Sequence, residues 1–317
     1  MNHASLNRRD FLNRTACAGA MLAFATRGAA AGQMYLSLNG SLVNKPGQPL
    51  PWQDFVRLAG KLGYGGADVN LGAARKDGVD ATRALLAEAK VKPAIGSLPV
   101  PFANADDGPF QSALQALDEQ AKFAAAIGLT RMMAVLGPAS PVPKAERHAF
   151  IKARLAPVAE ILARSNVRLG LEFLGPLHFR TPTERSPHQY IWTLNDTVAL
   201  AKELGPNIGV VLDIWHWHHS GGTTADILAA GKARIVHIHL SDAKAQPPEE
   251  VRDNQRLMPG EGVIDTTGFL QALKKIEYED AISPEPLGRV PTEMSPDEGA
   301  RLGLETSQAV MKKAGVL

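Results

Sequence analysis

Residues 209–214 read Gly-Val-Val-Leu-Asp-Ile, residues 224–230 read Thr-Ala-Asp-Ile-Leu-Ala-Ala, and residues 235–240 read Ile-Val-His-Ile-His-Leu. The first and third runs are short, apolar and rich in β-branched residues, which is typical of strands buried on both faces. The run between them has the apolar spacing of a short helix. The stretch therefore predicts a strand–helix–strand unit, which is the building block of parallel sheets.

The same alternation extends through most of the chain. We predict strands at 34–39, 66–71, 92–98, 131–136, 168–174, 209–214, 235–240 and 281–284, and helices at 52–62, 82–89, 110–127, 144–165, 193–204, 224–230, 267–276 and 296–314. Strands that are each followed by a helix, without a repeat or linker, predict one α/β domain over residues 32–317, a closed (β/α)₈ TIM barrel. An open doubly wound sheet is the alternative, but it normally has a Gly-rich phosphate turn after its first strand. Here that position reads Asn39-Gly40-Ser41-Leu42.

Residues 1–31 carry the features of an export signal. Arg8 and Arg9 precede Asp10-Phe11-Leu12, a mild apolar run covers residues 15–26, and Ala29-Ala30-Ala31 forms a small-residue cleavage pattern. The paired arginines indicate the twin-arginine type, which exports folded proteins. The apolar run is too short for a permanent membrane anchor. We therefore expect export through the twin-arginine machinery to the periplasm, with no membrane anchor in the mature form.

Charge and cysteine content exclude several classes of function. The formal net charge of the chain is +2, and residues 1–31 contain four arginines against one aspartate, so they contribute +3 and the rest of the chain −1. A near-neutral body argues against general binding of nucleic acid or other polyanions. The only cysteine, Cys17, lies in the expected signal. Its removal would exclude disulfides, thiolate metal ligands and a cysteine nucleophile.

Metal-capable side chains stand near the ends of four consecutive predicted strands. These residues are Glu172, Asp213, His239 and Glu285. Strand ends converge at one mouth of a parallel barrel, and a buried carboxylate is costly unless it is paired or binds a metal. Three oxygen donors and one imidazole suit Mn²⁺, Mg²⁺ or Co²⁺, with Zn²⁺ less favoured. We expect one divalent ion, with Mn²⁺ first. His237 faces the same side of its strand as His239 and is expected one layer deeper, as a hydrogen-bonded core residue.

With these residues in place, the sequence resembles the sugar phosphate isomerase/epimerase family of xylose-isomerase-like barrels. That family includes ketose 3-epimerases, hydroxypyruvate isomerases and inosose dehydratases. The resemblance covers most of the chain after residue 33. It rests on Leu171-Glu172, Asp213-Ile214-Trp215-His216, His237-Ile238-His239-Leu240-Ser241-Asp242, Arg256-Leu257-Met258-Pro259-Gly260-Glu261-Gly262 and Pro284-Glu285-Pro286. The order and strand-end placement of these motifs are specific for the family, but not for a substrate.

The resemblance implies roles for particular residues. Glu172 and Glu285 match the acid/base pair of the family, and they are also two of its four metal ligands. His216 and Arg256 match residues that contact substrate. There is one clear departure, because ketose 3-epimerases carry a second glutamate where this chain has His178.

Other parts of the expected mouth are less specific. Trp215 and Trp217 either form an apolar wall for a sugar face or pack the barrel rim. His218 and His219 are expected to be solvated loop residues. Two long excursions, residues 175–189 and 242–264, follow strands at the end where barrel chemistry occurs, so we expect them to shape the mouth.

These features predict a metal-dependent sugar isomerase or epimerase that acts through an enediolate on an unphosphorylated keto-sugar or derivative. The alternative is a dehydratase or hydratase at the same metal site, in which His178 would protonate a leaving hydroxyl. A multi-zinc endonuclease would need more ligands and a basic face. A non-catalytic sugar-binding protein would not need a carboxylate pair on a metal.

Overall fold

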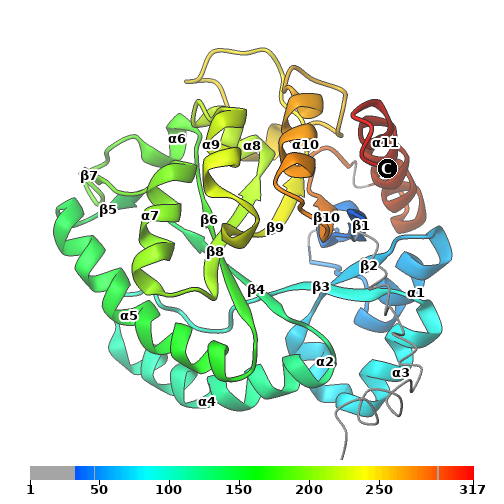
Figure 1. Cartoon of the computed structure of the whole chain (residues 1–317), viewed down its shortest axis with the longest axis horizontal. Helices are drawn as coiled ribbons and strands as arrows, with labels where there is room; N and C mark the ends of the chain where they lie inside the picture. Colours follow the sequence, from blue (N-terminus) through cyan, green and yellow to red (C-terminus); the bar gives the residue numbers. More distant parts are fainter. Residues whose placement is uncertain (1–32, 46, 291–292) are drawn as a thin grey trace, which may run out of the picture. The chain divides into compact units, whose positions relative to one another are not determined.

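The apolar runs of the sequence form a closed parallel barrel in the computed structural model, which describes residues 33–45, 47–290 and 293–317. The expected export signal, residues 1–31, lies outside the described residues. The barrel strands are β1 (Tyr35–Leu38), β2 (Gly66–Val69), β3 (Lys92–Ser97), β4 (Arg131–Leu136), β6 (Arg168–Phe173), β8 (Ile208–Asp213), β9 (Ile235–Leu240) and β10 (Ala281–Pro284). Strand β1 pairs with both β2 and β10 and so closes the ring. The predicted TIM barrel is confirmed (Figure 1).

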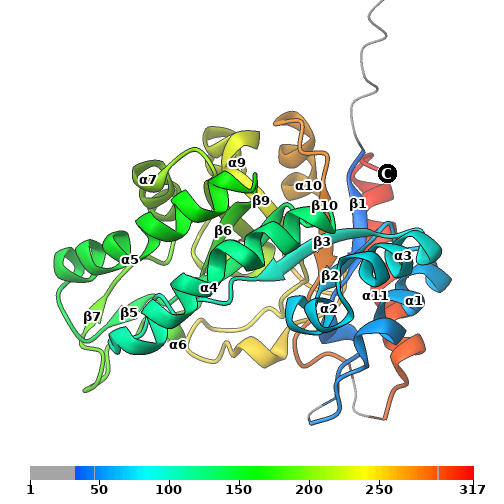
Figure 2. The same ribbon diagram turned by 90° about the horizontal axis from the view of Figure 1, so that it is seen from below.

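The helices lie outside the strands in both views (Figures 1 and 2). They are α1 (Trp52–Leu62), α2 (Leu71–Asp77), α3 (Val79–Ala89), α4 (Asp107–Ala126), α5 (Lys144–Arg164), α6 (Leu177–Arg180), α7 (Leu194–Leu204), α8 (Ile214–His219), α9 (Thr224–Ala230), α10 (Thr266–Lys275) and α11 (Pro296–Lys313). Each long helix buries one apolar stripe. In α5 the stripe is Ile151, Leu155, Val158 and Leu162, at the spacing of one helical face. None of the described helices has both the length and the apolarity needed to cross a membrane.

Strand register decides which side chains meet at the mouth of the barrel. Asp213 at the end of β8 is the direct partner of His239 in β9, and Leu240 is the partner of Pro284 in β10. Glu285 follows that pair immediately. Glu172 in β6 pairs with Val211, two residues before Asp213. The pairing therefore brings the four predicted metal ligands to nearly the same level of the barrel.

Short elements that were not predicted also shape the mouth. They are α2, α6, α8 and a two-stranded sheet made of β5 (Ala139–Ser140) and β7 (His188–Gln189). In Figure 2, α6, α2 and the yellow loop between β9 and α10 lie along the lower edge of the barrel. The two long excursions therefore contribute the mouth segments that were expected: α6 and β7 in the first, and the loop that carries Arg256 in the second.

Candidate metal centre and substrate cavity

The structure brings the four predicted metal ligands together. One donor atom from each of Glu172, Asp213, His239 and Glu285 lies within 4.8 Å of every other. His239 Nδ1 is 2.8 Å from Glu172 Oε1 and 3.3 Å from Glu285 Oε2. Asp213 Oδ1 accepts the backbone N–H of Trp215 at 2.7 Å, which caps α8 and leaves Oδ2 toward the cluster. The predicted convergence of these strand ends is therefore present in the structure.

The chemistry of this cluster fits a divalent cation. Glu172 is 5% exposed, and Asp213 and His239 are each 1% exposed. Two of the three neighbouring carboxylates, those of Glu172 and Asp213, are therefore almost fully buried. Buried charges of one sign at this separation need a compensating cation or protonation. Burial raises the pKa of Glu172 to about 7, although His239 opposes the shift. Three hard oxygen donors and one imidazole are ligands that divalent metals prefer.

Arg256 adds a positive charge next to the carboxylates of the cluster. Its guanidinium donates to Asp213 Oδ2 at 2.6 Å, to Glu285 Oε2 at 3.1 Å and to Asp253 Oδ1 at 2.7 Å. Burial raises the pKa of Asp213, but Arg256 and His216 outweigh it and hold that pKa at about 2. Burial also raises the pKa of Glu285, and His239 and Arg256 reverse the shift. Arg256, together with His239 at Glu285 and His216 at Asp213, therefore favours the ionised form of these two carboxylates.

The loop that carries Arg256 is organised by Asp242. This buried carboxylate accepts backbone N–H groups from Ala243, Gly260, Gly262 and Ile264 at 2.8–3.1 Å. Gly262 has no room for a side chain, because a Cβ there would lie 2.6 Å from Asp242 Oδ1 and 2.2 Å from a backbone oxygen. Asp242 also forms an isolated β-bridge with Leu257, next to Arg256. The Pro-Gly-x-Gly motif therefore fixes the guanidinium through the backbone.

A cavity of about 660 Å³, here called the site cavity, opens above the cluster. Its lining includes Glu172, Glu285, His216, Arg256 and Phe179 from the described residues. Burial lowers the pKa of His216 to about 4, so this imidazole is neutral near pH 7. Its Nε2 accepts a hydrogen bond from Arg256 at 3.3 Å. Both glutamates and the two predicted substrate contacts therefore face one space.

Three residues that the sequence suggested as substrate contacts, Trp215, Trp217 and His178, do not line the site cavity. Trp215 is 1% exposed and does not line the site cavity; its ring lies 4.8 Å from the Arg256 guanidinium and so supports the arginine. The ring centroids of Trp217 and Phe269 lie 5.2 Å apart, which agrees with the interpretation that Trp217 packs the barrel rim. His178 also lies outside the lining and packs 4.0 Å from Phe179, which does line the cavity.

The expectation that His218 and His219 are solvated loop residues is wrong. Both belong to α8, and the ring of His219 packs 4.5 Å from Trp215. The cap that Asp213 provides starts this helix directly after the strand, so the histidines fall on a partly buried turn.

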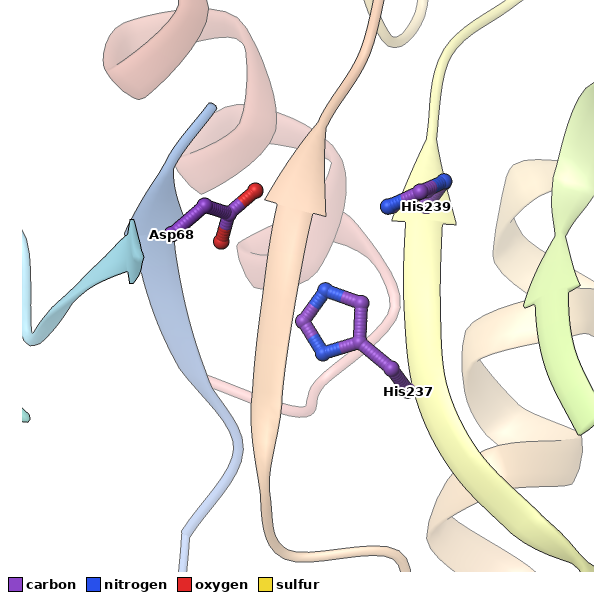
Figure 3. A group of neighbouring side chains, drawn as sticks. All are labelled: Asp68, His237 and His239. Atoms are coloured by element: carbon purple, nitrogen blue, oxygen red, sulfur yellow. The ribbon is translucent and has the colours of Figure 1, made fainter. Parts of the chain in front are cut away.

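A second group of side chains lies next to the metal ligands (Figure 3). Asp68, from β2, sits within 4.8 Å of donor atoms of His237 and His239, from β9. His237 is buried and hydrogen-bonds Ser283 at 2.9 Å, so the prediction of a hydrogen-bonded core residue is confirmed. Asp68 accepts hydrogen bonds from Ser37, Asn39 and Ser283 at 2.8–2.9 Å, and burial raises its pKa to about 6.

Asp68 was not predicted as a site residue, although the signal was present. It is a carboxylate within an apolar strand, as are Glu172 and Asp213. It also lines the site cavity.

Comparison with known proteins places this geometry in a family. A profile described as xylose isomerase-like TIM barrel matches residues 56–313. The inosose isomerase of Bacillus licheniformis is 28% identical over 159 residues, which is 50% of this chain and 54% of that protein. The chain thus matches about half the length of that curated relative.

Solved structures give the same fold. A xylose isomerase domain protein from Alicyclobacillus acidocaldarius superposes with a TM-score of 0.79 at 25% identity, over 89% of this chain and 99% of that one. A structure titled IOLI protein with a binding zinc atom superposes with a TM-score of 0.74 at 22% identity, over 89% and 99% of the two chains.

Proposed function

The chain belongs to the xylose isomerase-like TIM-barrel family, and from that premise we propose that it is a divalent-metal-dependent isomerase or epimerase. Its substrate would be an unphosphorylated keto-sugar or a related polyhydroxylated ketone. One observation carries the proposal: Glu172 and Glu285 approach the same imidazole, that of His239, and both line the site cavity. Two carboxylates at one reacting centre are what a reversible proton transfer needs.

Glu172, Asp213, His239 and Glu285 would hold the ion, and Mn²⁺ is the expected one, with Mg²⁺, Co²⁺ and Zn²⁺ as alternatives. When bound, such an ion supplies positive charge that acidifies the carbon next to a carbonyl and stabilises an enediolate. Arg256, fixed by its three carboxylate partners, would donate hydrogen bonds to substrate oxygens. Neutral His216 would accept or donate a hydrogen bond at a neighbouring hydroxyl.

The proton would move between substrate carbon and the two glutamates. One carboxylate removes the proton beside the carbonyl. Return of a proton by the other carboxylate to the opposite face of the same carbon inverts that carbon, which is epimerisation. Delivery to the former carbonyl carbon, together with transfer of the neighbouring hydroxyl proton to the former carbonyl oxygen, gives aldose–ketose isomerisation.

The dehydratase or hydratase alternative is less well supported. In that alternative, His178 would protonate the leaving hydroxyl. In the structure the ring of His178 packs on Phe179 and is absent from the lining of the site cavity.

Proton exchange tests the proposal directly. Metal-loaded protein is incubated in heavy water with a panel of unphosphorylated keto-sugars and inososes and followed by NMR. We expect deuterium at the carbon beside the carbonyl together with a new isomer. Exchange with loss of water would identify a lyase instead. No exchange with any member, despite binding, would identify a sugar-binding protein and end the proposal.

We also propose that the enzyme works in the periplasm after export as a folded protein. The support is the sequence of residues 1–31, with Arg8 and Arg9 ahead of an apolar run. Folding before export would let the chain acquire its metal in the cytoplasm.

A further inference from the structure

A second cavity lies beside the site cavity, over the ends of β1, β2 and β3. Its volume is about 510 Å³, and we call it the distal pocket; its lining includes Asn44, Leu50, Asp68, Asn70 and Gly72. Asn44 and Asp68 also line the site cavity, so the two spaces meet at these residues. Glu172 and Glu285 line only the site cavity. The distal pocket is therefore an extension away from the reacting centre.

The size of the two spaces indicates a substrate with two parts. Cavities of about 300–1,000 Å³ bind drug-sized ligands. The site cavity, at about 660 Å³, lies within that range, and a single sugar ring is smaller than a drug-sized ligand. The distal pocket, at about 510 Å³, adds room for a unit of similar size.

The lining of the distal pocket selects for a neutral, hydroxylated unit. Asn44 Oδ1 accepts the backbone N–H of Leu50 at 2.9 Å, and Asn70 Oδ1 accepts that of Ala73 at 3.0 Å. These bonds orient both amides and leave their NH₂ groups as donors for a ligand. Asp68 offers a carboxylate acceptor, and none of the lining residues is a lysine or arginine. A phosphate or carboxylate in this pocket would meet a negative charge without a balancing cation.

We propose that the distal pocket binds a second, neutral sugar unit, so that the substrate is a disaccharide or glycoside rather than a free monosaccharide. This inference rests on the proposed function for the chemistry of the first unit. The keto unit would lie over the metal cluster, and the appended sugar would lie against Leu50 with its hydroxyls toward the two asparagines.

A larger side chain at position 72 would fill the distal pocket and leave the site cavity unchanged. Gly72 lines that pocket and not the site cavity. A Cβ there would meet only Asn70 Oδ1, at 3.6 Å, which is an ordinary contact, so Gly72→Leu would place its bulk without a backbone clash. Gly108 is a matched control, because it also lies in the first turn of a helix and its Cβ would meet only Asp106 Oδ1, at 3.6 Å. Gly108 lines neither cavity.

The experiment measures equilibrium binding to metal-loaded protein by calorimetry. The probes are cellobiose, maltose and trehalose against methyl glucoside. At least one disaccharide should bind about tenfold tighter than methyl glucoside, or more, which corresponds to about 1.4 kcal/mol. Gly72→Leu should remove this advantage, and Gly108→Leu should keep it. Asn70→Asp, which retains the cap on α2 but loses the NH₂ donor, should reduce the advantage about two- to tenfold, the effect of one hydrogen bond.

Two outcomes would overturn the inference: no disaccharide binds tighter than methyl glucoside, or the advantage survives in Gly72→Leu. Because the readout is binding and not turnover, it is separate from the proton-exchange test. Tight disaccharide binding without proton exchange would remove the proposed function and leave the distal pocket as a sugar site.

Discussion

Single residues set the charge balance of the metal centre. Arg256 neutralises part of the charge of Asp213 and Glu285, while among the described residues Glu172 has His239 as its one hydrogen-bond partner. Removing one partner from a buried charged group leaves an uncompensated charge, which is costly. A bound divalent ion would satisfy all three carboxylates together. The cluster therefore favours metal binding as a unit rather than as independent ligands.

The first prediction concerns metal occupancy. Protein purified without chelators should hold about one divalent ion per chain, because four donors from four strands converge. Asp213→Ala and His239→Ala should each lower the bound metal severely, as measured by elemental analysis. Glu203→Ala is the control, since Glu203 is an exposed carboxylate on α7 that pairs with Lys152. Undiminished occupancy in both ligand variants would refute the assignment.

The second prediction concerns proton transfer. Glu172→Gln and Glu285→Gln keep the shape and one oxygen donor but lose the base. Each should lower kcat by a factor of about 10² or more, the usual scale of acid–base catalysis. Metal content must be measured in parallel, because both residues are also ligands. A fully metallated variant with near-normal turnover would exclude that glutamate from the mechanism.

The sequence predicted which strand or helix carries each of the site residues better than it predicted the direction of the side chain. The convergence of the four candidate ligands was predictable because their strands end at one mouth of the barrel. Of the two interpretations of Trp215, the structure favours packing, because α8, which begins at the cap on Asp213, places its ring against Arg256 and outside the lining of the site cavity. His178 does not line the site cavity either, since the short helix α6 presents Phe179 to the cavity instead.

The position of helix α8 depends on close packing against the segment that follows β6. Gly175 has no room for a side chain, because a Cβ there would lie 2.0 Å from the backbone oxygen of His216. The helix that carries His216 therefore packs directly on backbone. This contact links the loop after β6 to the position of a residue that faces the site cavity.

The third prediction follows from this contact. Gly175→Ala should destabilise the fold by about 1–3 kcal/mol, the cost of overpacking, and should weaken substrate binding by displacing α8. Denaturant unfolding and KM measure the two effects. Gly137→Ala is the control, because a Cβ at Gly137 meets nothing within 4 Å, and it should change stability by less than about 0.5 kcal/mol. Equal stability of the two variants would contradict the proposed packing.

The long helices were predictable because each spans enough residues to show a helical period, and the barrel strands because they are short apolar runs between the helices. The predicted helix at 52–62 coincides with α1, and the other boundaries shift by a few residues at most. The short helices α2, α6 and α8, of four to seven residues, were not predicted, although α9, with seven residues, was. They form because local caps and tertiary contacts favour them, as at Asn70 and Asp213.

For the molecule as a whole, the fourth prediction concerns export. Residues 1–31 hold four of the arginines of the chain, and only Arg8 and Arg9 are adjacent. Replacing both with lysine keeps the charge but removes the guanidinium pair, so the precursor should stay in the cytoplasm. Cell fractionation measures the change. The double variant Arg14→Lys with Arg27→Lys should still be exported. Periplasmic accumulation of the Arg8→Lys, Arg9→Lys protein would contradict the twin-arginine assignment.

The charge distribution around the two cavities also bears on the substrate. The site cavity is lined by four carboxylates and one guanidinium, and that guanidinium is already paired with Asp213, Glu285 and Asp253. Arg289, another candidate for a phosphate clamp, forms a bidentate ion pair with Glu261 at 2.8 and 2.9 Å. Lys244 does not line the site cavity. The described residues therefore leave no unpaired lysine or arginine to receive a phosphate at the reacting centre.

The fifth prediction is that the enzyme prefers unphosphorylated substrates. A phosphate brings about −1.5 to −2 charges near neutral pH, and carboxylates in a poorly solvated cavity would repel it. A divalent ion held by Glu172, Asp213, His239 and Glu285 would offset part of this field, and its positive charge would serve the carbonyl and the neighbouring hydroxyl. For matched pairs of keto-sugars, kcat/KM should be higher for the member without phosphate, and the difference should shrink as salt screens the exposed charges. A consistent preference for the phosphorylated member would show that Arg256 or Arg289 leaves its carboxylate partners when substrate binds, and would remove the charge argument for a neutral sugar.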